Sequence, residues 1–160
     1  MEYLKQYEIL LKKSKNDFLT AKLIYRAEEI DIEIALFHLQ QAVEKILKAL
    51  LLYNKIEAPK THNLDILIKL VVENNLILDI SEKFLDLNDY AVEARYDYLS
   101  DTFENFEEME KEVEILIEKI ERIIKEWIIG NWQDKVYPPI NAYKTTIKQQ
   151  KKFEPRDLGK

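Results

Sequence analysis

The sequence contains no cysteine, two glycines and four prolines among its 160 residues. Without cysteine, the chain can form no disulfide, no thiolate metal site and no cysteine nucleophile. With only Gly130 and Gly159, it cannot build the glycine-rich loops whose backbone amides cradle phosphate in P-loop and dinucleotide-binding folds. A nucleotide would therefore have to be held by side chains or helix ends.

Long apolar runs and a leader pattern are also missing. No run approaches the roughly 18–20 apolar residues that a bilayer-spanning helix needs. The first five residues, Met1-Glu2-Tyr3-Leu4-Lys5, lack the architecture of a signal peptide. We therefore expect a cytoplasmic protein that does not contact a membrane.

Metal ligands are scarce. His38 and His62 are the only histidines, and Ala35 stands where the Glu-x-x-His motif of di-iron bundles would need a glutamate. We therefore expect neither a metal site nor a cofactor. Hydrophobic residues, at 47%, are numerous enough for a core, and the abundance of Lys, Glu and Ile is compatible with a heat-adapted source.

Apolar residues recur at helical spacing along most of the chain. Two rows of residues spaced seven apart predict a helix over residues 2–28. The first row is Leu4, Leu11, Phe18 and Tyr25, and the adjoining row is Tyr7, Ser14 and Ala21. A second helix, over residues 32–54 with Asp31 as its cap, is the most apolar; its wide arc comprises Ala35, Leu36, Leu39, Ala42, Val43, Ile46, Leu47, Leu50 and Tyr53. Pro59 forbids its continuation.

Three further helical segments follow. Asn63 or Thr61 caps a segment that ends at Asn74-Asn75 and carries Leu64, Leu67, Ile68, Val71 and Val72. The next follows Ser81 and carries Phe84, Leu87, Ala91, Ala94 and Tyr98. Asp101 and Glu104 form a capping box for a long last helix with Phe106, Val113, Ile120 and Trp127 seven apart. No stretch alternates like a strand, so we predict an all-α, up-and-down bundle of four to five helices over residues 1–129.

Two features suggest surfaces for association. The wide apolar arc of the second helix, with Phe37, Leu51 and Leu52 on its flank, exceeds the need of one intramolecular seam and predicts a homodimer. Residues 130–160 carry +4, and because the whole chain carries −6, residues 1–129 carry −10. We expect this basic extension to dock on an acidic surface through Trp132, Tyr137 and Tyr143, although a frayed tail is the alternative.

Three polar clusters are candidate sites. On the second helix, opposite its core face, lie His38, Gln41, Glu44, Lys45 and Lys48. The second cluster is Glu93-Ala94-Arg95-Tyr96-Asp97-Tyr98, in which a guanidinium fork and aromatic faces suit a phosphate or carboxylate and a ring. The third is the loop Pro59-Lys60-Thr61-His62-Asn63 at a helix N-terminus. A solvated face, an interhelical salt bridge and simple capping are the respective structural alternatives.

Together these clusters resemble the HEPN domain (higher eukaryotes and prokaryotes nucleotide-binding). The matching segments are Ala35–Leu50, which contains His-x-x-Gln-Ala-x-Glu-Lys-x-Leu-Lys-Ala, then Lys60–Leu64, which contains Thr-His-Asn-Leu, and Tyr90–Tyr96, which ends in Arg-Tyr. The resemblance covers about residues 5–128. It implies a four- to five-helix bundle that usually dimerises through its central helices. It also implies frequent pairing with a minimal nucleotidyltransferase, often in a toxin–antitoxin or defence module.

The resemblance has one clear departure. Many members are ribonucleases with Arg, four to six residues, then His. After Arg95 those positions hold Ser100, Asp101 and Thr102, and none of the other three arginines is followed by histidine at that spacing. The charge of −10 on residues 1–129 also opposes RNA binding. The branch resembled is therefore the non-nucleolytic one.

We accordingly hypothesise a non-catalytic module that binds a nucleotide or a nucleotidyltransferase. The predicted ligand-binding residues are His38, Gln41, Glu44, Lys45, Lys48, Lys60, His62, Arg95, Tyr96 and Asp97, with no catalytic residue among them. We expect Arg95 to lie beside the second helix and to contact Asp97, Glu93 or Glu44. Two alternatives stay open: a metal-independent ribonuclease with His62 as a displaced base, and a purely structural interaction protein.

Overall fold

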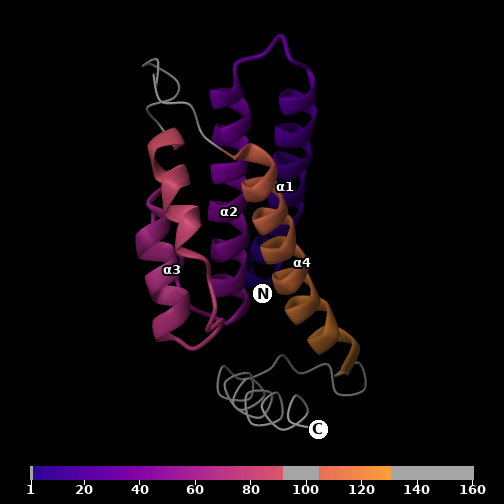
Figure 1. The fold of residues 1–160 in the computed structure, drawn as a ribbon. Coiled ribbons are helices and arrows are strands. Elements are labelled where there is room, and N and C mark those ends of the chain that lie inside the picture. The colour runs from indigo at the N-terminus through magenta and orange to yellow at the C-terminus, as the bar shows by residue number, and fades with distance from the viewer. Residues whose placement is uncertain (1, 92–104, 131–160) are drawn as a thin grey trace, which may run out of the picture.

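The computed structural model describes residues 2–91 and 105–130, with side chains placed for residues 6–91 and 105–125. Within them all the regular secondary structure is helical and there is no strand, as predicted. The elements are α1 (Glu2–Arg26), α2 (Ile32–Tyr53), α3 (Leu64–Glu73), a 3-10 helix η1 (Glu82–Tyr90) and α4 (Phe106–Gly130). Figure 1 shows α2 between α1 and α3, and α2 contacts every other element.

The predicted packing rows of the first two helices are confirmed. Tyr7, Ser14 and Ala21 are buried on α1, so the adjoining row forms the centre of the seam, while Leu11, Phe18 and Tyr25 are partly buried. On α2 the buried alanines Ala35, Ala42 and Ala49 recur at the same sevenfold spacing. Ser14 Oγ donates to the carbonyl of Ala42 at 2.7 Å. Small residues thus allow α1 and α2 to approach closely.

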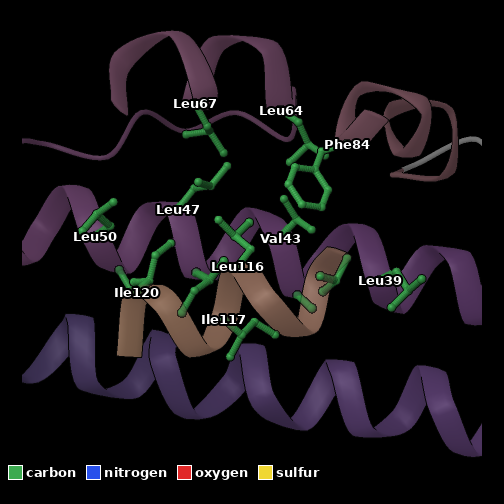
Figure 2. Close-up of a cluster of buried hydrophobic side chains, with 14 of the residues drawn as sticks. Leu39, Val43, Leu47, Leu50, Leu64, Leu67, Phe84, Leu116, Ile117 and Ile120 are labelled. Carbon is green, nitrogen blue, oxygen red and sulfur yellow. The ribbon is translucent and has the colours of Figure 1, made fainter. Parts of the chain in front are cut away.

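The core gathers on α2. In Figure 2, leucines and Val43 of α2 meet side chains from α3, η1 and α4; the labelled residues are Leu39, Val43, Leu47, Leu50, Leu64, Leu67, Phe84, Leu116, Ile117 and Ile120. All of them are buried. Because each fully buried apolar side chain contributes about 1.5–3 kcal/mol, this cluster accounts for a large part of the driving force of folding.

Two helix ends are set by residues with positive φ. Lys55 (φ 59°) follows α2, and the amides of Lys55 and Ile56 donate to the carbonyls of Leu52 and Leu51. Asn75 (φ 53°) closes α3 in the same way. Both are Schellman motifs. Asn74-Asn75 therefore ends α3 as predicted, and α2 ends before Pro59 is reached.

Three local predictions differ from the structure. Residues 82–90 form a 3-10 helix capped by Ser81, because Phe84, Leu87 and Tyr90 are buried at a spacing of three, which suits three residues per turn. Helix α4 begins at Phe106, and the amide of Glu108 donates to Asn105 Oδ1 at 3.2 Å, so Asn105 and not Asp101 caps it. Asp31 occupies the N-cap position of α2 but makes no side-chain cap bond.

The apolar arc of α2 packs against other elements of the same chain. Leu51 and Leu52 are buried in the core and Phe37 is half-buried. These residues therefore supply no exposed apolar face for dimerisation, although the homodimer itself stays a prediction. Residues 131–160 of the basic extension, with Trp132, Tyr137 and Tyr143, lie outside the described residues, as do Ala94, Tyr98, Asp101 and Glu104. Gly130, the first residue of the predicted extension, is the last residue of α4.

Candidate functional site

The polar strip of α2 is not an open solvated face. Glu44 is only 4% exposed, and His38, Gln41, Lys45 and Lys48 are all partly covered. One edge of the strip contacts α1 through Asp17, and the other contacts the loop of residues 59–63 through His62. The alternative of a solvated face is therefore wrong for this strip, because neighbouring elements contact both of its edges.

Glu44 is the centre of the first half of the site. Its Oε1 accepts from Lys48 Nζ at 2.8 Å, an i,i+4 pair along the helix. Its Oε2 accepts from His62 Nδ1 at 3.0 Å, Gln41 Nε2 at 3.3 Å and Gln40 Nε2 at 3.4 Å. A buried carboxylate is costly unless its oxygens are satisfied. Four donors satisfy this one.

The same network holds the loop of residues 59–63 against α2. Gln40 is fully buried, and its Nε2 donates to the carbonyl of His62 at 2.9 Å. Gln41 Nε2 in turn donates to Gln40 Oε1 at 2.7 Å. His62 is thus tied to α2 through both its main chain and its ring, while its side chain is 62% exposed. Gln40 was not among the predicted site residues.

Asp17 of α1 is the centre of the second half of the site. Its Oδ1 accepts from His38 Nδ1 at 3.0 Å and its Oδ2 accepts from Lys45 Nζ. Burial alone would raise the pKa of Asp17, but the hydrogen bonds from His38 and Lys45 outweigh it and hold that pKa below its usual value. Asp17 was missed by sequence reasoning. The available signal was its place between Ser14 and Phe18, at the flank of the α1 packing seam.

The end of the loop of residues 59–63 acts chiefly as a helix cap. Asn63 Oδ1 accepts from the amide of Asp65 at 2.9 Å, which confirms one of the two predicted caps of α3. The amide of Leu64 donates to Asn88 Oδ1 of η1 at 2.8 Å. These two amides are therefore satisfied by side chains, which weakens the expectation of an anion site at this helix end. Lys60 is exposed on the loop.

The second predicted cluster lies outside the part of the chain that is described. Arg95, Tyr96 and Asp97, together with Glu93, fall in residues 92–104. The flanks of this segment are anchored: Tyr90 is buried, and Phe106 stacks on Tyr25 with ring centroids 4.0 Å apart. The expected contact between Arg95 and the second helix accordingly stays a prediction.

The histidine contacts decide which ring nitrogen carries a proton. A carboxylate can only accept hydrogen bonds. Nδ1 of His38, facing Asp17, and Nδ1 of His62, facing Glu44, must therefore be the protonated nitrogens. In a neutral ring this leaves Nε2 with its lone pair, available as an acceptor or as a base. The site thus contains two imidazoles held by carboxylates on the two edges of one helical strip.

The described residues contain neither a cluster of metal ligands nor a candidate membrane span. No group of three or more His, Cys, Asp or Glu residues there could hold a metal ion. Nor does any helix in the described ranges combine the length and the apolarity that a membrane span requires.

The described residues form a helical bundle, and a polar network joins α2 to α1 and to the loop of residues 59–63. The model of the HEPN domain family matches residues 7–128, which is more than half of the chain. The chain therefore belongs to the HEPN domain family, whose members are nucleotide-binding or ribonuclease-like modules. Comparison with curated proteins and with solved structures gives no match.

Proposed function

We propose that this chain is a non-catalytic HEPN module that binds a nucleotide. The observation that carries the proposal is the Glu44 network. In this network a buried carboxylate and a buried glutamine hold one exposed histidine of a loop against α2. A lysine pairs with the same carboxylate. A loop that served only as a connection would need no buried charge. Such an arrangement is typical of a site whose ligand contacts are positioned before the ligand arrives.

The proposed ligand contacts are those predicted from sequence. On α2 they are His38 and Gln41, with Glu44, Lys45 and Lys48 holding their neighbours in place, and on the loop they are Lys60 and His62. We propose Arg95 as the phosphate contact, because its planar fork matches phosphate oxygens. Tyr96 and Asp97 would then contact the remainder of the nucleotide.

A thermal-shift screen with mono-, di- and triphosphates tests the proposal. A ligand present at about 100 times its Kd adds about 2.7 kcal/mol of stability, which corresponds to a rise in Tm of roughly 5–10 °C for a chain of this size. Arg95→Ala should abolish the shift. Arg122→Ala, which removes an exposed arginine of α4, should leave it intact. If no nucleotide shifts the Tm, the chain is a structural interaction protein.

We further propose that its protein partner is a minimal nucleotidyltransferase, in a toxin–antitoxin or defence system, and that the chain forms a homodimer. The support is membership of a family in which such pairing is frequent. A gene for a small nucleotidyltransferase next to this one would favour the pairing. Co-purification of the two proteins would test it directly, and separate elution of the two at micromolar concentration would count against it.

A metal-independent ribonuclease is the second candidate function, and one contact favours it. With Nδ1 of His62 donating to Glu44 at 3.0 Å, the ring is oriented and Nε2 can act as a base. Structured and unstructured RNA should be incubated with the full-length chain in the presence of a chelator. Cleavage that is lost in His62→Ala would establish this activity and overturn the non-catalytic proposal.

A further inference from the structure

Both lysines of the α2 strip are already paired with carboxylates, whereas Lys60 lies on the neighbouring loop. Lys48 pairs with Glu44 and Lys45 pairs with Asp17. Each carboxylate is thereby balanced by an ammonium group, and neither needs a charged imidazole for neutrality. Two carboxylates and two ammonium groups sum to zero. A phosphate, which is recognised by unpaired cations, gains little from these two lysines of α2.

The groups left over on the strip are hydrogen-bond acceptors. With Nδ1 donating to Glu44, a neutral His62 ring presents the lone pair of Nε2 on a side chain that is 62% exposed. Gln41 uses its amide nitrogen twice, toward Gln40 and Glu44. Its Oε1 has no hydrogen-bond partner among the described residues. Both ends of the Gln41 amide are thereby assigned, since only the nitrogen can donate to a carboxylate.

The two side chains that carry these acceptors meet at one carboxylate oxygen. His62 Nδ1 and Gln41 Nε2 both donate to the same atom, Glu44 Oε2, at 3.0 and 3.3 Å. The two side-chain heads therefore meet at one oxygen, and the fully buried Gln40 fixes both of them by bonding the His62 carbonyl and the Gln41 amide. Two acceptors on side chains fixed in this way are complementary to a ligand that carries N–H or O–H donors.

We infer that Nε2 of His62 and Oε1 of Gln41 recognise donor groups of a nucleoside, either an exocyclic amino group or the vicinal hydroxyls of ribose, and that phosphate is bound elsewhere. This inference rests on the proposed function and specifies which part of the ligand the strip contacts. A site built to accept hydrogen bonds discriminates against analogues that lack the donor, because its polar groups are then left unpaired.

Calorimetric titration of the full-length chain at about pH 8, where an imidazole is ordinarily neutral, tests the inference. The probes are adenosine, guanosine and cytidine, which carry an exocyclic amine, uridine, which does not, the four 2′-deoxy forms, and inorganic pyrophosphate. Weaker binding of uridine than of the amino nucleosides identifies the amine as the recognised group. Weaker binding of the 2′-deoxy forms identifies the ribose hydroxyls.

The variants Gln41→Met and His62→Ala should each weaken nucleoside binding by about tenfold, as expected for one lost hydrogen bond, and should leave pyrophosphate binding unchanged. Lys12→Ala, on the exposed side of α1, is the matched control and should change neither. The His62 side chain is exposed on a loop. His62→Ala therefore tests the inference even if Gln41→Met lowers the melting temperature.

The outcomes separate this inference from the proposed function. If a nucleotide raises the Tm but no nucleoside binds, or if either variant weakens pyrophosphate binding, the strip contacts phosphate or nothing at all. The inference is then overturned while the proposed function stands. If neither nucleotides nor nucleosides bind, both fail.

Discussion

At the scale of single residues, two carboxylates organise the polar half of α2. Glu44 and Asp17 each bind one lysine and one histidine, and each joins α2 to a different neighbour. A carboxylate with several donors is stabilising only while all partners are present. The contribution of each network should therefore be measurable by removing the acid alone.

Glu44→Gln should lower the free energy of unfolding by about 2–4 kcal/mol. Glutamine keeps the size of the side chain but places an NH2 group where Lys48 and His62 need an acceptor. Urea unfolding followed by circular dichroism measures the change. The matched variant is Glu118→Gln, at an exposed position of α4, which should change stability by less than about 0.5 kcal/mol. Equal values for the two variants would contradict the role assigned to Glu44.

Asp17 should contribute to the loss of folding stability as the pH falls. Its pKa in the folded protein is below its usual value, while the unfolded chain titrates near the ordinary value of about 3.9. The stabilisation is therefore present above about pH 4 and is lost as pH falls through the lower, folded pKa. Glu121, whose pKa is lowered by hydrogen bonds from Lys125 and Lys15 despite partial burial, acts in the same direction.

Asp17→Asn should make the loss of stability between about pH 5 and pH 2 shallower than in the unmodified chain, and should reduce stability at neutral pH. Urea midpoints collected across that range are the measurement. Asp86→Asn, at an exposed position of η1, should leave the slope unchanged. An acid limb as steep in Asp17→Asn as in the unmodified chain would show that this carboxylate is not linked to folding.

At the scale of the elements, the sequence pattern and the structure differ on where α4 begins. Asn105 Nδ2 also donates to Glu108 Oε2 at 2.9 Å, so cap and third residue bond each other reciprocally. The pattern Asp-x-x-Glu occurs at 101–104 and Asn-x-x-Glu at 105–108, and sequence reasoning chose the first. The choice fails because Phe106, which is buried and stacks on Tyr25, fixes where the helix enters the core.

Asn105→Ala should therefore destabilise the chain by about 1 kcal/mol, the usual cost of losing a cap. The companion variant Asp101→Ala should have little effect, because the helix starts after that position. Thermal melts of the two variants under identical conditions decide between the assignments. A larger loss of Tm in Asp101→Ala than in Asn105→Ala would restore the sequence-based cap.

At the scale of the whole molecule, charge is distributed unevenly between the bundle and the extension. Residues 1–129 carry −10 and residues 130–160 carry +4. Exposed ion pairs contribute only about 0–1 kcal/mol each, so any docking of the extension must rely on Trp132, Tyr137 and Tyr143, each of which could add about 1.5–3 kcal/mol when buried. The core members among the described residues lie between Tyr7 and Ile124.

Deletion of residues 131–160 should weaken a dimer without unfolding the bundle, because an extension docked on the partner would be lost while the core is kept. Sedimentation measures the association constant, and circular dichroism in parallel reports the helical content. An unchanged association constant would show that the extension does not join the subunits. A monomer in the full-length chain at micromolar concentration would instead contradict the dimer itself.

The sequence by itself determined the helical class, most of the core and the ends of α2 and α3. These features depend on local spacing: Tyr7, Ser14 and Ala21 recur every seven residues whatever they contact, and Asn75 favours a positive φ in any context. The family motifs likewise depend on order along the chain, and the HEPN match over residues 7–128 confirms that resemblance.

Only the tertiary structure decided how the polar residues are used. Asp17 and His38 are separated by 21 residues, and Glu44 and His62 by 18, so no periodicity relates them. Their contacts exist because the core draws α1, η1 and the loop of residues 59–63 against α2, which encloses a strip that helical geometry alone would leave in solvent. The same packing buries Leu51 and Leu52 within the chain. A pattern reports which face a residue occupies, whereas the fold decides what covers that face.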